Sequence, residues 1–202
     1  MRVTKSQAQA NRAHIVETAS TLFRERGYDG VGVADLMAAA GFTHGGFYKH
    51  FHSKAELMAE AATSGLSQSL ASTEGMDVAQ FFKLYLSRKH RDARSAGCTM
   101  AALSGDAARQ SEDIKATFAA GIENLLAVLG REGAMPGDVD QRSVRAKMIG
   151  MLAHAVGAVV LSRSCPDDSS LSDEILEVCR KQIPAPLSSA GRPASVQKRA
   201  RR

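Results

Sequence analysis

Apolar residues recur at helical spacing along most of the chain, and no stretch alternates in the way that is typical of a strand. Ile15 and Phe23 belong to one apolar stripe, which predicts a first amphipathic helix. Thr4 or Ser6 can cap its amino end, and Gly27 ends it. The chain therefore opens on one long helix.

Two short helices are expected next, over residues 34–40 and 44–50, separated by the turn AAGFTH. A brief, glycine-containing turn between two helices is the signature of a helix-turn-helix. The run SKAE, residues 53–56, is a capping box and predicts a fourth helix that reaches about residue 70.

The remainder of the chain keeps the helical pattern and then loses it. After Pro184 the sequence is rich in Pro, Ser, Ala and positive charge, so we expect a disordered tail over residues 184–202. The pattern predicts an all-α fold, with further helices at 77–90, 98–110, 112–131, 139–163 and 171–182.

The charge is uneven, and both ends are basic. Residues 1–54 carry seven Lys/Arg against four Asp/Glu, residues 55–182 carry fourteen against seventeen, and residues 183–202 carry five against none. This distribution favours contact with a polyanion near the ends. No apolar run approaches the roughly 18–20 residues of a membrane span, and the polar N-terminus is not a secretory signal. We expect a cytoplasmic protein with no membrane partner.

The three cysteines, Cys98, Cys165 and Cys179, are odd in number and widely spaced. They match neither a disulfide framework nor a zinc site. No glycine-rich phosphate loop and no common hydrolase or metalloprotease motif is present. We therefore expect no catalytic residues, no metal and no cofactor.

Gly45 and Gly46 are adjacent within the third helix, where each glycine costs about 1 kcal/mol relative to alanine. A recognition helix must bring its first turns against base edges and phosphates, and glycines remove side chains that would hold the backbone away. Thr43 would cap this helix, and its hydroxyl and the free N–H groups suit a phosphate. The alternative is that the glycines mark a loop or a close contact between helices.

Tyr48 and Lys49 point away from the face that Phe47 and Phe51 share, because the two phenylalanines are four residues apart. Tyr48 and Lys49 are therefore free to reach phosphates and bases. His44, at the exposed first turn, could meet a base edge.

The run GFTHGGFYKHFHSKAEL, residues 41–57, and the preceding stretch from Ile15 resemble the DNA-binding domain of TetR-family transcriptional regulators, of the TetR/AcrR type. The resemblance implies an N-terminal helix-turn-helix reader over residues 1–54, with a flexible arm. It implies a helical effector-binding and dimerisation domain over residues 55–183. The matching residues are Ile15, Ala19, Phe23, Gly27, Tyr28, Leu36, Ala40, Gly41, Phe42, Thr43, Gly46, Tyr48, His50, Phe51, Ser53, Lys54 and Leu57.

The resemblance also implies a function and partners: a homodimer on a palindromic double-stranded DNA operator, usually a repressor, released by a small-molecule effector. Val31 and Gly32 depart from the family pattern, which has hydroxyl residues there, so no phosphate role is assigned to them. A phosphate contact is carried over to Lys54. The residues expected to bind DNA are Thr43, His44, Gly45, Gly46, Tyr48, Lys49, His50 and Lys54.

The C-terminal half offers candidates for two further sites, and each candidate could equally be plain core. The effector pocket is expected between the middle helices, and the dimer interface on the last two helices, where small residues recur three or four apart. The pocket candidates are Phe82, Tyr85, Cys98, Met100, Leu103, Phe118, Ile122 and Leu125. The interface candidates are Gly150, Ala153, His154, Gly157, Ile175 and Val178.

Cys98 has its own alternatives. It is expected to open a helix, near His90, Arg91 and Arg94, and such surroundings favour a reactive thiolate that could sense electrophiles or oxidants. It could also be a small residue that fills the start of a buried helix. Two rival functions remain open: a helical enzyme that uses the Cys98 thiol, and a ligand-binding protein without DNA activity.

Overall fold

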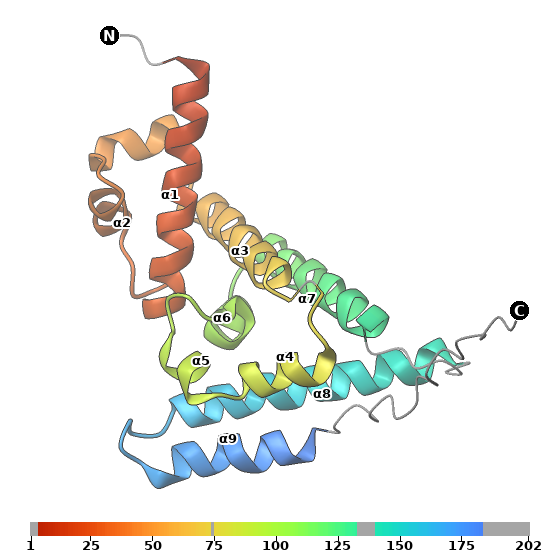
Figure 1. The fold of residues 1–202 in the computed structure, drawn as a ribbon. Helices are drawn as coiled ribbons and strands as arrows, with labels where there is room; N and C mark the ends of the chain where they lie inside the picture. Colours follow the sequence, from red (N-terminus) through yellow and green to blue (C-terminus); the bar gives the residue numbers. More distant parts are fainter. Residues whose placement is uncertain (1–3, 74, 133–139, 184–202) are drawn as a thin grey trace, which may run out of the picture.

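The computed structural model describes residues 4–73, 75–132 and 140–183, and these residues form helices and loops only. The all-α prediction is confirmed; the predicted tail, 184–202, lies outside the described residues. The elements, shown in Figure 1, are α1 (Lys5–Arg26), α2 (Val33–Ala39), the 3₁₀ helix η1 (His44–Lys49), α3 (Lys54–Ala71), α4 (Val78–Tyr85), α5 (Arg88–Asp92), α6 (Thr99–Ala107), α7 (Glu112–Glu132), α8 (Gln141–Arg163) and α9 (Ser170–Gln182).

The amino-terminal helices pack around one aromatic cluster. Phe47 and Phe51 are each 1% exposed, and their ring centroids lie 5.5 Å apart, as the four-residue spacing predicts. Thr4 is the residue that caps α1, because its hydroxyl accepts a hydrogen bond from the N–H of Gln7. The turn between α2 and η1 contains Gly41 at φ +79°, a conformation that favours glycine.

The capping box at the start of α3 forms in part. The hydroxyl of Ser53 accepts from the N–H of Glu56 at 3.1 Å. The carboxylate of Glu56, however, accepts from the N–H of His52 at 2.7 Å, one residue before the expected partner. The helix therefore begins where the sequence predicts, with its carboxylate bonded to a neighbouring amide.

Two predicted helices differ in detail from the observed ones. The segment 44–50 is a tighter 3₁₀ helix rather than an α-helix. The segment 77–90 is broken at Leu86 into α4 and α5, because the hydroxyl of Ser87 accepts from the N–H of His90 and starts a new helix there. Serine competes in this way with the backbone ladder of a continuing helix.

The aromatic cluster does not stop at residue 54. Leu103 of α6 and Phe118 of α7 are buried in the same cluster as Phe23 and Leu57. α3 lies along both α1 and α7, and Figure 1 shows α6 in the angle between α1 and the lower helices. The proposed boundary between residues 54 and 55 remains a prediction, but the packing is continuous across it.

A second apolar cluster joins α4, α7, α8 and α9, with Phe82, Leu126 and Val159 among its buried members. In Figure 1, α8 and α9 run side by side at the bottom of the molecule, beneath α4 and α5. α8 is long and apolar enough to cross a membrane by length and composition alone, which the sequence analysis did not anticipate. Core helices of soluble proteins pass the same test, so this is weak evidence for a span.

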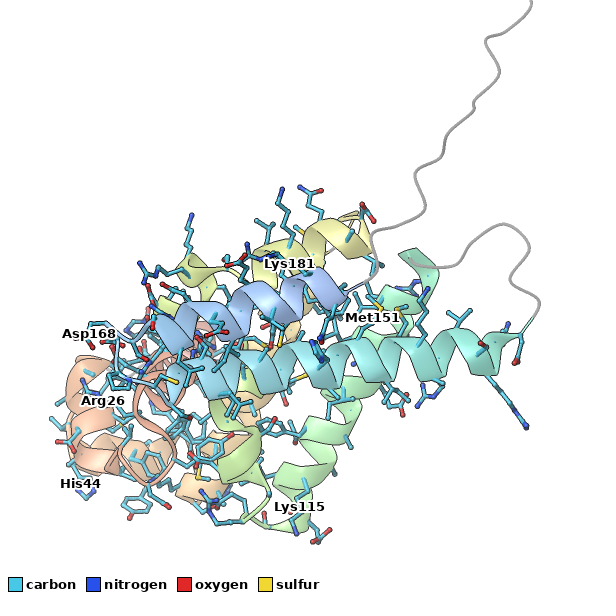
Figure 2. The ribbon with its side chains drawn as sticks, turned by 90° about the horizontal axis from the view of Figure 1, so that it is seen from below. Arg26, His44, Lys115, Met151, Asp168 and Lys181 are labelled. Atoms are coloured by element: carbon cyan, nitrogen blue, oxygen red, sulfur yellow. The ribbon has the colours of Figure 1, made fainter. Side chains whose placement is uncertain are left out.

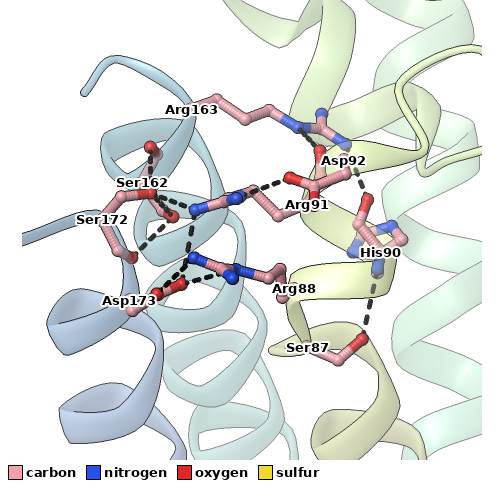
Figure 3. Close-up of polar contacts among 9 residues, drawn as sticks. All are labelled: Ser87, Arg88, His90, Arg91, Asp92, Ser162, Arg163, Ser172 and Asp173. Atoms are coloured by element: carbon pink, nitrogen blue, oxygen red, sulfur yellow. Dashed lines mark hydrogen bonds and ion pairs between the residues drawn. The ribbon is translucent and has the colours of Figure 1, made fainter. Parts of the chain in front are cut away.

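Polar contacts tie α5 to the last two helices (Figure 3). Arg91 is 5% exposed, and its guanidinium donates to the hydroxyl of Ser172. Arg88 pairs with Asp173 through two hydrogen bonds of 3.0 and 2.5 Å. Arg163 of α8 donates to the carbonyl oxygens of Arg91 and His90 at 2.9 and 3.1 Å. α5 is thus held against α8 and α9 by buried Arg91, half-buried Arg163 and exposed Arg88.

Candidate functional site

The outer surface of η1 carries the first candidate site. Tyr48 is 68% exposed, while its neighbour Phe47 is 1% exposed and anchors the helix to the cluster below. Thr43, His44 and Lys49 are also exposed. Thr43 precedes η1 without a side-chain capping bond, so its hydroxyl is available to a ligand. The structure thus brings these predicted DNA-binding residues to one exposed surface.

The two glycines of η1 are not required by the fold. A Cβ added to Gly45 would meet nothing within 4 Å, and one added to Gly46 would make ordinary contacts of 3.6 Å with Met37 and Thr43. By contrast, a Cβ at Gly30 would lie 2.2 Å from the carbonyl oxygen of Arg26. Internal packing therefore explains Gly30, and it does not explain Gly45.

His50 and Lys54, the remaining DNA-binding candidates, are both half-buried and make contacts within the domain. The Nζ of Lys54 donates to the carbonyl oxygen of Tyr28 at 2.5 Å and lies 5.9 Å from the ring centre of Phe23. The carbonyl oxygen of His50 accepts from the Nε of Arg12 at 3.2 Å. Both residues hold η1 and α3 against α1, so their DNA contacts remain predictions.

Arg12 is a supporting residue that the sequence analysis missed. Its guanidinium lies 4.4 Å from the ring centre of Phe51 and pairs with Glu56 and Glu60 of α3. The hydrogen bond to Glu60, followed by the nearby carboxylate charges, raises the pKa of Arg12. Its position one turn before Ile15 offered no sign that it would cross to the other helix.

A cavity of about 500 Å³ is the second candidate site. It lies among α3, α4, α5, the start of α6 and α7, and of the predicted pocket residues Tyr85, Cys98 and Leu125 line it. The other predicted residues do not line it. Phe82 and Met100 are buried in the second apolar cluster. Leu103 and Phe118 are buried in the aromatic cluster beneath η1. Ile122 is 36% exposed on α7. Periodicity identifies a buried face, but it does not identify the neighbour that the face packs against.

Arg24 of α1 also lines this cavity, and the sequence analysis did not single it out. It is 8% exposed; its Nε donates to the carbonyl oxygen of Ser95 at 2.7 Å, and its Nη1 donates to the hydroxyl of Ser20 at 2.6 Å. Burial lowers the pKa of Arg24. The one sequence signal was Ser20, a hydrogen-bonding partner four residues earlier on the same helix.

Cys98 is the residue that caps the start of α6, as expected, and it is 7% exposed. Its backbone N–H donates to the Nε2 of His90 at 3.2 Å, and the Nδ1 of His90 donates to the carbonyl oxygen of Tyr85 at 2.7 Å. His90 therefore carries its proton on Nδ1 and is neutral. Burial is the main cause that lowers the pKa of His90. Arg91, expected beside Cys98, instead turns toward Ser172.

The outward face of α8 and α9 is the third candidate site. Figure 2 shows these helices side by side, with Met151 on α8 and Lys181 on α9. Among the predicted interface residues, Gly150, Ala153 and Val178 are exposed, and His154, Gly157 and Ile175 are half-buried. Large apolar side chains that were not predicted for the interface are exposed on α8: Ile149 is 44% exposed, Val160 41% and Leu161 60%. On α9, Leu171 is 51% exposed.

Two features of α8 bear on what covers this face. A Cβ added to Gly150 or to Gly157 would meet open space, so neither glycine is needed for packing inside the chain. The Nε2 of His154 is buried and has no hydrogen-bond partner within the part of the chain that the structure describes. Buried polar atoms in folded proteins rarely lack a partner.

Comparison with known proteins places the amino-terminal site in a family. Residues 15–61 match the model of the family described as "Bacterial regulatory proteins, tetR family". The HTH-type transcriptional regulator TtgR of Pseudomonas putida is 45% identical over 58 residues, which cover 29% of this chain and 28% of that protein. The chain thus matches less than a third of that relative's length, and the match is confined to one part of it.

Longer alignments are weaker in identity. The HTH-type transcriptional repressor NemR of Escherichia coli K12 is 25% identical over 139 residues, covering 64% of this chain and 70% of NemR. The crystal structure of reduced E. coli NemR superposes with a TM-score of 0.64 at 21% identity, over 86% of this chain and 95% of that one. These relatives are named as regulators and not as enzymes, in agreement with the expectation that the chain is not an enzyme. The amino-terminal segment of the chain therefore matches the tetR family of bacterial regulatory proteins, and its fold is that of NemR.

Proposed function

We propose that the chain is a repressor that binds a palindromic DNA operator as a homodimer and leaves it when a small molecule occupies the cavity. The observation that carries this proposal is the exposed surface of η1, where Gly45 has no packing role. Because Gly45 lies between the exposed residues Thr43 and Tyr48 on a short helix, its missing side chain suits a surface that approaches another molecule closely.

The chemistry of this surface suits DNA. The hydroxyl of Thr43 and the ammonium of Lys49 can contact phosphates, and Tyr48 projects an aromatic ring with a hydroxyl that can reach a phosphate or a base edge. Phe47 and Phe51 fix the helix beneath, so these groups approach DNA from a rigid support. Most protein–DNA hydrogen bonds are made to the DNA backbone, and most of these side chains are suited to phosphate contacts.

The outward face of α8 and α9 supports a dimer. Five large apolar side chains are 41–60% exposed there: Ile149, Val160, Leu161, Leu171 and Val178. Two copies of the helix pair related by a two-fold axis would form a four-helix bundle that covers this face. Two readers would then meet successive major grooves about 34 Å apart.

Repression, rather than activation, is supported by the similarity to NemR, which is named as a transcriptional repressor. Release follows from geometry, because affinity requires both readers to dock at once. A ligand that changes the separation of the two DNA-binding surfaces lowers the affinity for DNA. By the same coupling, bound DNA lowers the affinity for the ligand.

The sharpest test replaces Gly45 with leucine and compares it with the same change at Gly105 of α6. A Cβ meets open space at both positions, so both variants should fold and dimerise. We expect Gly45→Leu to lose specific binding to DNA from upstream of the chain's own gene in a mobility-shift assay, while Gly105→Leu binds as the parent does. Raising the salt concentration separates specific from nonspecific complexes. Full binding by Gly45→Leu would contradict the proposal.

Tyr48→Ala and Lys49→Ala test the same surface by removing its donors. Both side chains are exposed, so circular dichroism and sedimentation should match the parent. Loss of the Lys49 phosphate contact should also reduce the salt dependence of binding by about one ion. If neither variant changes the affinity, η1 is not the reading element.

Release by an electrophile is a second form of the effector proposal, favoured by the position of Cys98 on the cavity wall. The thiol-enzyme alternative would need a base beside the Cys98 thiol. His90, the histidine near Cys98 in the sequence, has its Nε2 on the backbone N–H of Cys98 and its Nδ1 on the carbonyl oxygen of Tyr85. Both ring nitrogens are therefore occupied by backbone groups rather than directed at the thiol.

A further inference from the structure

Arg24 is a buried cation without a carboxylate partner. Its hydrogen bonds go to the carbonyl oxygen of Ser95 and the hydroxyl of Ser20, and no ion pair is formed with it among the residues that the structure describes. Its Nη2 group makes no hydrogen bond within the same residues. A buried guanidinium is costly unless it is paired with a negative charge. The cavity that Arg24 lines is where such a charge could enter.

Two more polar groups near Arg24 are buried without partners. The hydroxyl of Tyr85, which lines the cavity and is 6% exposed, has no nitrogen or oxygen partner within the described chain. Burial, followed by the neighbouring Cys98 thiol, raises the pKa of Tyr85. The hydroxyl of Thr99, which is 1% exposed, also has no hydrogen-bond partner within the described residues. Gly65 lies where Thr99 and Arg24 converge, because a Cβ there would lie 2.4 Å from the Thr99 hydroxyl and 2.7 Å from Arg24 Nη1. Unsatisfied donors of this kind are rare in native proteins.

The rest of the cavity wall divides by polarity. Lys89 also lines the cavity and is a second cation, and none of the side chains known to line the cavity is acidic. Met76, Phe81, Leu84 and Leu125 supply apolar surface. A volume of about 500 Å³ is in the range of cavities that hold small organic ligands. The ligand should therefore have an apolar body and one anionic end.

We propose that the cavity binds a small organic carboxylate whose charged group is held by Arg24 and whose apolar body lies against Phe81 and Leu125. The guanidinium fork matches a carboxylate in geometry and charge, and Tyr85 can donate a further hydrogen bond. This inference names the chemical class of the effector and so rests on the effector part of the proposed function.

The position of Arg24 on α1 would couple the bound ligand to the proposed DNA-binding surface of η1. Arg24 belongs to α1, which also carries Ile15 and Phe23 into the cluster under η1. A carboxylate on Arg24 competes with the bond to Ser95 and changes how the end of α1 is held against the α5–α6 loop. The bound and free states therefore differ in contacts at the junction between the reader and the rest of the chain.

The test compares 2-naphthoate with its neutral amide, 2-naphthamide, by isothermal titration of the purified full chain without DNA. The two probes share their apolar body and differ in charge. We expect the carboxylate to bind the parent protein at least about tenfold more tightly than the amide, as a charged hydrogen-bonded pair implies. In Arg24→Met the preference should fall to about unity, whereas Lys89→Met, a change at an exposed cation on the same cavity wall, should retain most of it.

Gly65→Ala is the second variant, because its methyl group would displace the Arg24 guanidinium without removing the charge. It should lower the affinity for the carboxylate and leave that for the amide nearly unchanged. Equal binding of the two probes to the parent protein, no saturable binding of the carboxylate at millimolar concentration, or a full preference in folded Arg24→Met would each overturn the inference. None of these readouts uses DNA, so they separate this inference from the proposed function.

Discussion

The proposed dimer face gives a prediction whose size can be worked out from one side chain. Leu161 is 60% exposed in the single chain. Full burial of a leucine side chain contributes about 2 kcal/mol, so covering the exposed part contributes roughly 1.2 kcal/mol per copy. A two-fold dimer contains the residue twice, which gives roughly 2.4 kcal/mol. Leu161→Ser should therefore raise the dimer dissociation constant about 50-fold.

Sedimentation velocity over a dilution series from micromolar to nanomolar protein measures this constant. Leu84→Ser is the matched control, because Leu84 is 52% exposed but lines the cavity instead of the α8–α9 face. The control should dimerise as the parent does, and both variants should keep the helical circular-dichroism signal of the parent, since neither side chain is buried within the single chain. An unchanged constant for Leu161→Ser, or a monomeric parent, would refute the reasoning.

Three further predictions concern the core, the cavity histidine and the thiol. Phe47 is 1% exposed, so Phe47→Ala should lower the free energy of unfolding, measured with urea, by about 3–5 kcal/mol; a loss below about 1 kcal/mol would mean that η1 is not anchored there. Burial lowers the pKa of His90, so the folded state binds fewer protons than the unfolded state below the ordinary histidine pKa of about 6.5. Stability should therefore fall as the pH drops below that value, and His90→Gln should flatten the decline. Cys98→Ser should abolish release from DNA by N-ethylmaleimide without changing DNA affinity; a normal response would exclude Cys98 as the sensor.

The arrangement of α2, η1 and the start of α3 was predictable from the sequence because local signals determine it. Phe47 and Phe51 share a face by spacing alone, the Ser53 cap starts α3, and Gly41 permits the turn between α2 and η1. Each signal acts over at most four residues. The exposure of Tyr48 follows from the same spacing, since a residue next to a buried Phe47 on a short helix points outward.

The cavity was not predictable in the same way because it is made by side chains far apart in sequence. Leu103 and Phe118 were expected to line it, and they turn instead to the cluster around Phe23. Arg24 comes from α1 and reaches Ser95, 71 residues later. Helical periodicity fixes which residues on a helix are buried, but the packing of α6 and α7 against α1 and α3 decides what each of them meets.

α6 shows why the proposed effector cavity and the proposed DNA-binding surface need not belong to separable domains. At its amino end Cys98 lines the cavity, and one turn later Leu103 is buried in the reader cluster. Near its carboxyl end, Asp106 accepts a hydrogen bond from the N–H of Tyr28 at 3.0 Å, at the turn that leaves α1. On the proposed function, a displacement of α6 at the cavity would act directly on the α1–α2 turn, because this one short helix meets both. Separation of the chain at residue 54 would therefore expose apolar surface on both parts and remove the contacts of α6 with α1 and the α1–α2 turn.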